Sequence, residues 1–139
     1  MTLSPAHRRV LDAALALVRD QRRRAETAPF KPDLVWTSPF ALGYLAGAVD
    51  GLCQAHGAPF DAAGLAVFAL VLDDTFGPDA ADDLRRQSVA LLRAGDADFA
   101  RGRAWGGNEA MGAAQGRHTP AGLVHLARGD EGRMGPPRE

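Results

Sequence analysis

The sequence predicts an all-α protein, a compact bundle of five to six helices joined by short loops. Three observations support this fold class. Apolar residues recur with the 3.6-residue period of a helix, serine-proline and glycine-proline pairs mark helix starts and breaks, and no alternating run of β-branched or aromatic residues indicates a strand. The 139 residues fit one domain that can bury a core. We expect residues 1–128 to form it and residues 129–139, which lack apolar periodicity, to be a disordered tail.

The first predicted helix runs from residue 5 to about residue 26. Ser4 and Pro5 form a helix start, in which serine caps the helix and proline occupies its first turn. The apolar residues that follow share one face: Val10, Leu11, Ala14, Leu17 and Val18. The helix ends in a basic turn, which complements the negative end of the helix dipole. Two prolines in residues 27–37 then favour an extended linker.

The next two predicted helices, residues 39–56 and 61–76, are apolar around most of their circumference. Such helices are usually buried on several sides. A bundle of this size shelters one central helix more easily than two, so we expect the remaining apolar surface to pack against a second copy of the chain. Because closed two-fold dimers are the commonest soluble assembly, the sequence predicts a homodimer. The alternative is a monomer whose other helices cover both.

Three further helices are expected toward the C-terminus, and they cover residues 78–94, 96–105 and 120–128. Gly77-Pro78 and Gly95-Asp96 supply the breaks before the first two of them. The glycine-rich stretch after Trp105 is expected to form at most a weak helix that Asn108 caps. Thr119-Pro120 is expected to open the last helix.

Three glycines spaced four apart, Gly43, Gly47 and Gly51, lie on one side of the second helix. At about 100° per residue, Asp50 falls in the same stripe, opposite a leucine-valine face. Glycine in a helix interior costs about 0.5–1 kcal/mol relative to alanine. Three interpretations stay open: the stripe faces water, another backbone packs closely on it, or a ligand lies over it. If the stripe is covered, Asp50 needs a partner, such as an arginine or a group of a second copy.

Four aspartates near the break between the third and fourth helices form a candidate metal site: Asp73, Asp74, Asp79 and Asp82. Paired carboxylates on facing helices hold Mg²⁺ or Mn²⁺, an arrangement that all-α nucleotide hydrolases use. Asp79 and Asp82 are explained equally well as first-turn charges that favour the helix dipole. A small metal-dependent hydrolase therefore stays an alternative, and no cofactor is expected.

The other reactive side chains lack the spacing of known catalytic sites. The four histidines form no His-x3-His or His-Glu-x-x-His pattern, and Cys53 lies in an apolar helix, where a thiol is usually inert. No nucleophile elbow or phosphate-binding loop occurs. Near Trp105, however, Arg101, Arg103 and Asn108 form a candidate contact site for a ligand or partner, because arginine and aromatic side chains dominate many interfaces.

The leading functional hypothesis is a non-enzymatic interaction or regulatory module that acts as a cytoplasmic homodimer and binds a protein partner. The N-terminus lacks a signal-peptide pattern, and no apolar run approaches the length of a membrane span. A net charge of −1 creates no field that attracts nucleic acid or an anionic membrane. A helical DNA-binding regulator stays a second alternative because of the basic end of the first helix: Arg19, Arg22, Arg23 and Arg24.

Overall fold

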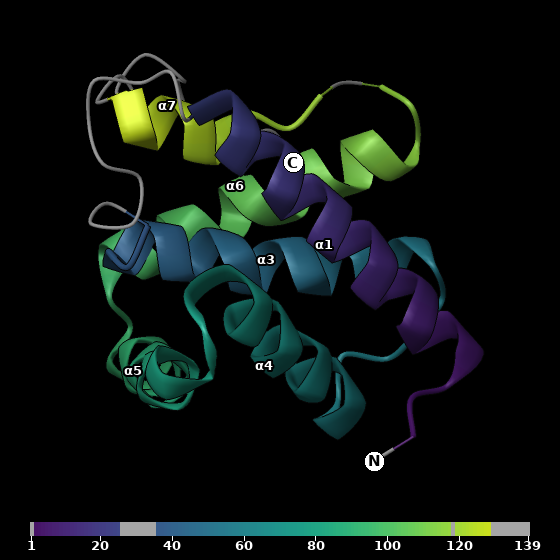
Figure 1. The fold of residues 1–139 in the computed structure, drawn as a ribbon, viewed down its shortest axis with the longest axis horizontal. Helices are drawn as coiled ribbons and strands as arrows, with labels where there is room; N and C mark the ends of the chain where they lie inside the picture. Colours follow the sequence, from purple (N-terminus) through teal and green to yellow (C-terminus); the bar gives the residue numbers. More distant parts are fainter. Residues whose placement is uncertain (1, 26–35, 118, 129–139) are drawn as a thin grey trace.

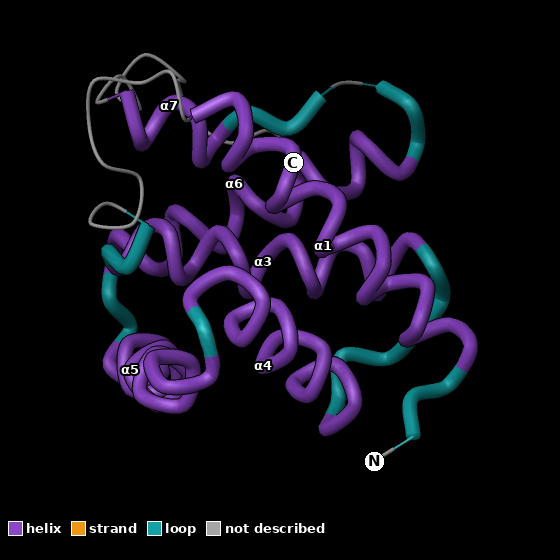
Figure 2. Tube along the Cα trace, in the orientation of Figure 1, coloured by secondary structure: helices purple, strands orange, loops and turns teal. Residues whose placement is uncertain are grey.

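The structure is a computed structural model that describes residues 2–25, 36–117 and 119–128. Figure 2 shows helices and connecting turns throughout these ranges, with no strand, which confirms the all-α prediction. The helices, labelled as in Figure 1, are α1 (Pro5–Ala25), α3 (Pro39–Ala55), α4 (Ala62–Phe76), α5 (Pro78–Ala94), α6 (Ala97–Ala114) and α7 (Gly122–Arg128). None of them is long and apolar enough to cross a lipid bilayer. The predicted tail, residues 129–139, lies outside the described residues.

Helix α3 is the centre of the bundle. It contacts each of the other described helices, with α1 crossing it on one side and α4 packing on another (Figure 1). Every residue from Phe40 to Val49 is buried, and Leu42, Tyr44 and Leu45 are among the largest side chains that are fully enclosed. The helix that the sequence marks as apolar all round is therefore the one that the fold surrounds.

Local cap residues explain where several helices begin. The Ser38 hydroxyl accepts the backbone N–H of Ala41 at 3.3 Å, and Asp96 accepts that of Phe99 at 2.9 Å. Gly95 lies between α5 and α6 with a φ of 68°, a left-handed conformation that glycine adopts without strain. Helix α5 has no side-chain cap at its start, but Pro78 in its first turn and Gly95 after its last turn both act within a few residues, which is why its bounds agree with the sequence prediction.

Helix α1 is held at its start by His7. Its backbone N–H donates to the Ser4 hydroxyl at 3.1 Å, and its ring Nε2 donates to the carbonyl oxygen of Pro59 at 2.8 Å. The imidazole thus links α1 to the turn between α3 and α4.

Helix α6 is longer than the sequence predicts. The predicted helix ended near Trp105 and a weak one began at Asn108, but α6 continues through both residues to Ala114. Gly106 is buried within it, and a Cβ built at that position would overlap the carbonyl oxygen of Tyr44 on α3. The close contact with α3 compensates for the low helix propensity of glycine, which a local rule weighs in isolation.

Helix α7 starts at Gly122, two residues later than predicted. The Thr119-Pro120 pair does not cap it. Instead, the Glu109 carboxylate on α6 accepts the backbone N–H of Gly122 at 2.8 Å, and the Gln21 side chain on α1 accepts that of Leu123 at 2.8 Å. The caps come from two distant helices, so the local sequence does not reveal them.

Helix α4, unlike α3, is enclosed on one face only. Its buried residues are Gly64, Val67, Phe68, Val71, Leu72 and Thr75. The opposite side, between residues 62 and 70, carries Ala62, Leu65, Ala66, Ala69 and Leu70, which we call the α4 face. Leu65 is 49% exposed and Leu70 is 41% exposed. The bundle therefore encloses one of the two apolar helices and leaves apolar surface on the other.

Candidate functional site

The glycine stripe of α3 lies against the backbone of α6. A Cβ built on Gly47 would overlap the carbonyl oxygen of Arg103, and one built on Gly51 would lie 2.6 Å from the carbonyl oxygen of Gly107. Gly43, one turn earlier on α3, lies equally close to the backbone of α6. The contacts advance in the same direction along both helices, so α3 and α6 run parallel. Another backbone thus covers the stripe, and this packing accounts for the glycines without a ligand.

The contact is reciprocal, because α6 also contributes glycines. Gly102 lies against the backbone of Phe40, and Gly106 lies against that of Tyr44, each so closely that a Cβ would overlap a carbonyl oxygen of α3. Each helix therefore presents a side-chain-free surface to the other. We call this set of contacts the glycine interlock: Gly43, Gly47, Gly51, Gly102 and Gly106.

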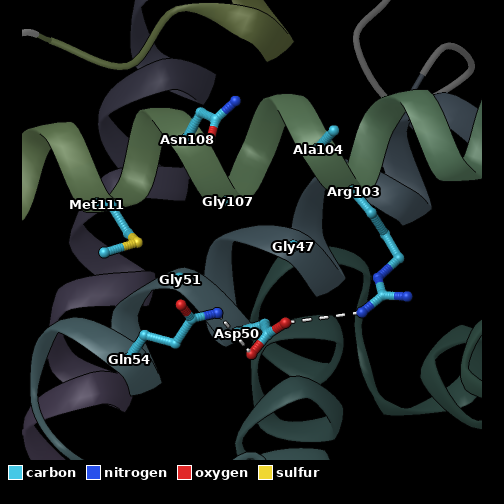
Figure 3. Close-up of a pocket in the computed structure, with 9 residues that line it drawn as sticks. All are labelled: Gly47, Asp50, Gly51, Gln54, Arg103, Ala104, Gly107, Asn108 and Met111. Atoms are coloured by element: carbon cyan, nitrogen blue, oxygen red, sulfur yellow. Dashed lines mark hydrogen bonds and ion pairs between the residues drawn. The ribbon is translucent and has the colours of Figure 1, made fainter. Parts of the chain in front are cut away.

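A polar groove of about 320 Å³ runs along one edge of the glycine interlock (Figure 3). Its lining residues come from α3 and α6: Gly47, Asp50, Gly51, Gln54, Arg103, Ala104, Gly107, Asn108 and Met111. Glycine backbone forms part of the lining, so the space beside the helix contact stays open. Figure 3 shows the side chains of Asp50, Gln54, Met111 and Arg103 on one side of α6, whereas that of Asn108 points away from them.

The Asp50 carboxylate lies between two partners in this groove. One of its oxygens is 3.6 Å from a guanidinium nitrogen of Arg103, and the other accepts a hydrogen bond from the Gln54 amide at 3.4 Å (Figure 3). The side chains of Asp50 and Arg103 are 28% and 36% exposed. Water therefore screens the pair, and such pairs contribute about 0–1 kcal/mol. The charge in the apolar helix has both a partner and access to solvent.

Most of the contact and helix-packing candidates from the sequence line this groove: Gly47, Asp50, Gly51, Arg103 and Asn108. Gly43, Trp105 and Arg101 do not. The indole of Trp105 packs against the core near Gly122, and its Nε1 is buried without a hydrogen-bond partner among the described residues. The guanidinium of Arg101 lies 4.6 Å from the centroid of the Phe40 ring, a cation–π contact within the chain.

Two of the four acidic residues of the alternative metal site make separate ion pairs. The Asp74 carboxylate accepts two hydrogen bonds from Arg19, at 2.6 and 3.1 Å. Asp82 pairs with Arg85 and Arg86 on its own helix, and these contacts lower the pKa of its carboxyl. The other two members, Asp73 and Asp79, are exposed. Within the described ranges, no group of three His, Cys, Asp or Glu side chains is arranged to hold a metal ion.

The arginines at the end of α1 make contacts within the chain. Arg22 donates to the carbonyl oxygen of Thr75 at 2.5 Å, and Arg24 donates to that of Pro120. Arg23 pairs with the carboxylate of Asp20 at 2.7 Å. With the Arg19 pair, these contacts tie α1 to the end of α4 and to the segment before α7. The DNA-binding alternative, which rests on this basic cluster, stays a prediction.

A buried polar network joins α1, α3, α6 and α7, and it was not predicted from the sequence. The Gln21 amide donates to the Tyr44 hydroxyl at 2.9 Å, and this hydroxyl donates to the Glu109 carboxylate at 2.5 Å. Gln21 and Tyr44 are fully buried. Burial, together with the neighbouring carboxylate, raises the pKa of Tyr44 well above its ordinary value. The local clue was Gln21, a polar residue one turn beyond Leu17 on the buried face.

An apolar hollow of about 100 Å³ adjoins the α4 face, and its position was also not predicted. Its lining residues come from four helices and one turn: Ala46, Phe60, Leu65, Phe68, Arg85, Ser88, Val89, Leu92, Phe99 and Arg103. Phe60, Leu65 and Leu92 are at least one-third exposed, and Leu92 reaches 51%. Arg103 lines both this hollow and the polar groove, so the two depressions are neighbours.

No family model, curated protein or solved structure matches this chain. The cytoplasmic location and the dimeric state stay predictions.

Proposed function

We propose that this protein is a non-enzymatic interaction module that pairs with a second copy of itself through the α4 face. The proposal rests on the position of the exposed apolar side chains, which gather on and beside α4. Among the described residues, the exposed large hydrophobic ones are Phe60, Leu65, Leu70 and Leu92. Two of them lie on α4 and the other two line the adjoining hollow with Leu65. Contiguous exposed apolar surface on a folded protein marks an interaction site.

The α4 face has the composition of a helix–helix contact. An amphipathic helix at the surface normally turns charged residues outward. On α4 the outward residues between 62 and 70 are apolar, and charges appear only from Asp73 onward. Three alanines, Ala62, Ala66 and Ala69, lie among the two leucines. Their short side chains let a second helix approach closely, since helix separation depends on side-chain size at the contact.

A second copy of the chain suits this surface better than an unrelated partner. A two-fold axis beside α4 brings the same apolar face to both sides of the contact, so one interface covers both exposed surfaces. The hollow beside Leu65 receives apolar side chains from the opposite copy. A net charge of −1 on each copy opposes this association only weakly.

Light scattering over a range of protein concentrations tests the proposal, with a doubled molar mass expected at high concentration. Leu65→Asp should weaken the dimer. Leu65 is about half exposed, so covering it contributes about 1 kcal/mol per copy. Losing this from both copies raises the dissociation constant about 30-fold, and a carboxylate buried without a partner raises it further.

Ala90→Asp is the matched control, because Ala90 is exposed on α5, the helix of Leu92, but does not line the hollow. This variant should dimerise like the wild type. A wild-type protein that stays monomeric at every concentration refutes the proposal. A Leu65→Asp variant that dimerises as tightly as Ala90→Asp removes the α4 face from the interface.

A further inference from the structure

A third depression, of about 380 Å³, lies between α1 and the end of α6, over the last turns of α3. Its lining residues are Ala13, Ala16, Leu17, Asp20, Leu52, His56, Ala113, Ala114 and Pro120. We call it the alanine pocket. It shares no residue with the α4 face or with the hollow beside it, so its role is independent of dimerisation.

Short side chains keep the alanine pocket open. Ala13 and Ala16 line it from α1, and Ala113 and Ala114 line it from α6. Each of these side chains ends at Cβ, so the gap between the two helices stays unfilled. The largely buried Leu17 and Leu52 add apolar surface. A concave, mainly apolar pocket of about 300–1,000 Å³ with a few polar groups is the usual form of a small-molecule site.

Asp20 is a polar group that the fold holds in place at this pocket. Arg24 fixes it, because one guanidinium nitrogen of Arg24 lies 3.3 Å from the carboxylate and another donates to the carbonyl oxygen of Pro120. Arg23 contacts the same carboxylate from the more exposed side at 2.7 Å. A carboxylate has about four acceptor positions, so it can accept a further hydrogen bond from a molecule in the pocket.

The charges around Asp20 determine which head group fits. Two guanidinium groups already offset the carboxylate charge, so a third cation gains little and still loses its hydration. An anionic head group offers only acceptor atoms to the Asp20 carboxylate, which lines the pocket and is itself only an acceptor, whereas the donors of Arg23 and Arg24 do not line it. A hydroxyl donates to the carboxylate without adding charge. We propose that the alanine pocket binds a small neutral molecule with an aliphatic body and a hydroxyl group that donates to Asp20.

Calorimetric titration with straight-chain alcohols, from n-butanol to n-octanol, tests this proposal. Each added methylene should tighten binding about fourfold until the pocket is full. At equal chain length, n-hexanol should bind at least tenfold more tightly than n-hexanoate or protonated n-hexylamine. Equal affinity for the alcohol and the carboxylate would overturn the assignment of the head group, and no binding at millimolar concentration would overturn the site.

Two filling variants locate the binding. Ala16→Phe and Ala114→Phe place a ring at the pocket from opposite walls, and both positions are exposed, so the fold accommodates them. Each should abolish alcohol binding, whereas Ala90→Phe on the exposed side of α5 should leave it unchanged. Asp20→Asn keeps an acceptor oxygen but removes the charge, so n-hexanoate should then bind nearly as well as n-hexanol. Alcohol binding that survives both filling variants would refute the proposal.

Discussion

Replacing Gly47 with alanine would place a methyl group inside the contact between α3 and α6. The new Cβ would overlap the carbonyl oxygen of Arg103 and lie 2.8 Å from the Cα of the same residue. Both atoms belong to the backbone, so no side-chain rotation relieves the overlap. The two helices must move apart along the glycine interlock, which loosens the other close contacts in it.

The expected net loss of unfolding free energy for Gly47→Ala is about 2 kcal/mol. Inserting an extra methyl into a well-packed interior costs typically about 1–3 kcal/mol, and a backbone contact belongs at the upper end because it cannot relax locally. The higher helix propensity of alanine returns about 1 kcal/mol. The packing cost is larger than the gain in helix propensity, so the substitution should destabilise the fold.

Gly107→Ala is the matched control within the same pair of helices. A Cβ at Gly107 would meet the carbonyl oxygen of Gly47 at 3.4 Å, which is ordinary van der Waals contact. The propensity gain then dominates, and this variant should be as stable as the wild type or up to about 1 kcal/mol more stable.

Urea unfolding followed by far-ultraviolet circular dichroism measures both variants, and unchanged m-values would show that the comparison is between stabilities alone. The reasoning is refuted if Gly47→Ala unfolds at the wild-type midpoint. It is refuted equally if Gly107→Ala loses as much stability as Gly47→Ala, because the two positions would then not differ in the way that the contacts require.

Further predictions concern three single side chains. Tyr44→Phe leaves the buried Gln21 amide without its acceptor, so urea unfolding should show a loss of about 1–3 kcal/mol, and a loss near zero would show that the network does not stabilise the fold. Burial, together with Asp50 and Asp61, raises the pKa of the Cys53 thiol from 9.0 to about 11. The folded protein should therefore react with iodoacetamide much more slowly than the unfolded one at neutral pH. Because the pKa of this thiol is higher in the folded state, its ionisation leaves the free energy of unfolding unchanged below about pH 9 and lowers it as the pH rises toward 11. Urea unfolding across this pH range measures the loss. Asp50→Ala should cost less than about 1 kcal/mol in the same assay, because its ion pair is partly exposed, and a larger loss would contradict the screening argument.

The bounds of helices with local start and stop signals were predictable from the sequence. Helix α5 begins at Pro78 and ends before Gly95, as the sequence predicts, because a proline in the first turn and a left-handed glycine act within one turn of the chain. The extent of α6 was not predictable in this way. Gly106 is unfavourable for a helix by itself and becomes favourable only when α3 lies against it, which is information from about 60 residues away.

Several residues of the polar groove were predictable from the sequence, but their arrangement around one groove was not. The angular position of Asp50 among the glycines follows from helix geometry, and Arg103 was a candidate because of its type. That the two lie 3.6 Å apart depends on the parallel register of α3 and α6, which the glycine interlock sets. The sequence likewise indicated more apolar surface than one chain can bury. Which helix keeps that surface exposed depends on how α1, α5 and α6 share the space around α3.

Cross-linking at Ala66, in the middle of the α4 face, tests the pairing of two copies most directly. The single native cysteine, Cys53, is buried, so a cysteine introduced at the surface is the reactive thiol. With a short bismaleimide, Ala66→Cys should form a covalent dimer in high yield at concentrations where light scattering finds the doubled mass, whereas Ala90→Cys should stay largely monomeric. Equal yields from the two variants, or no covalent dimer from Ala66→Cys under those conditions, would contradict the claim that the chain pairs through α4.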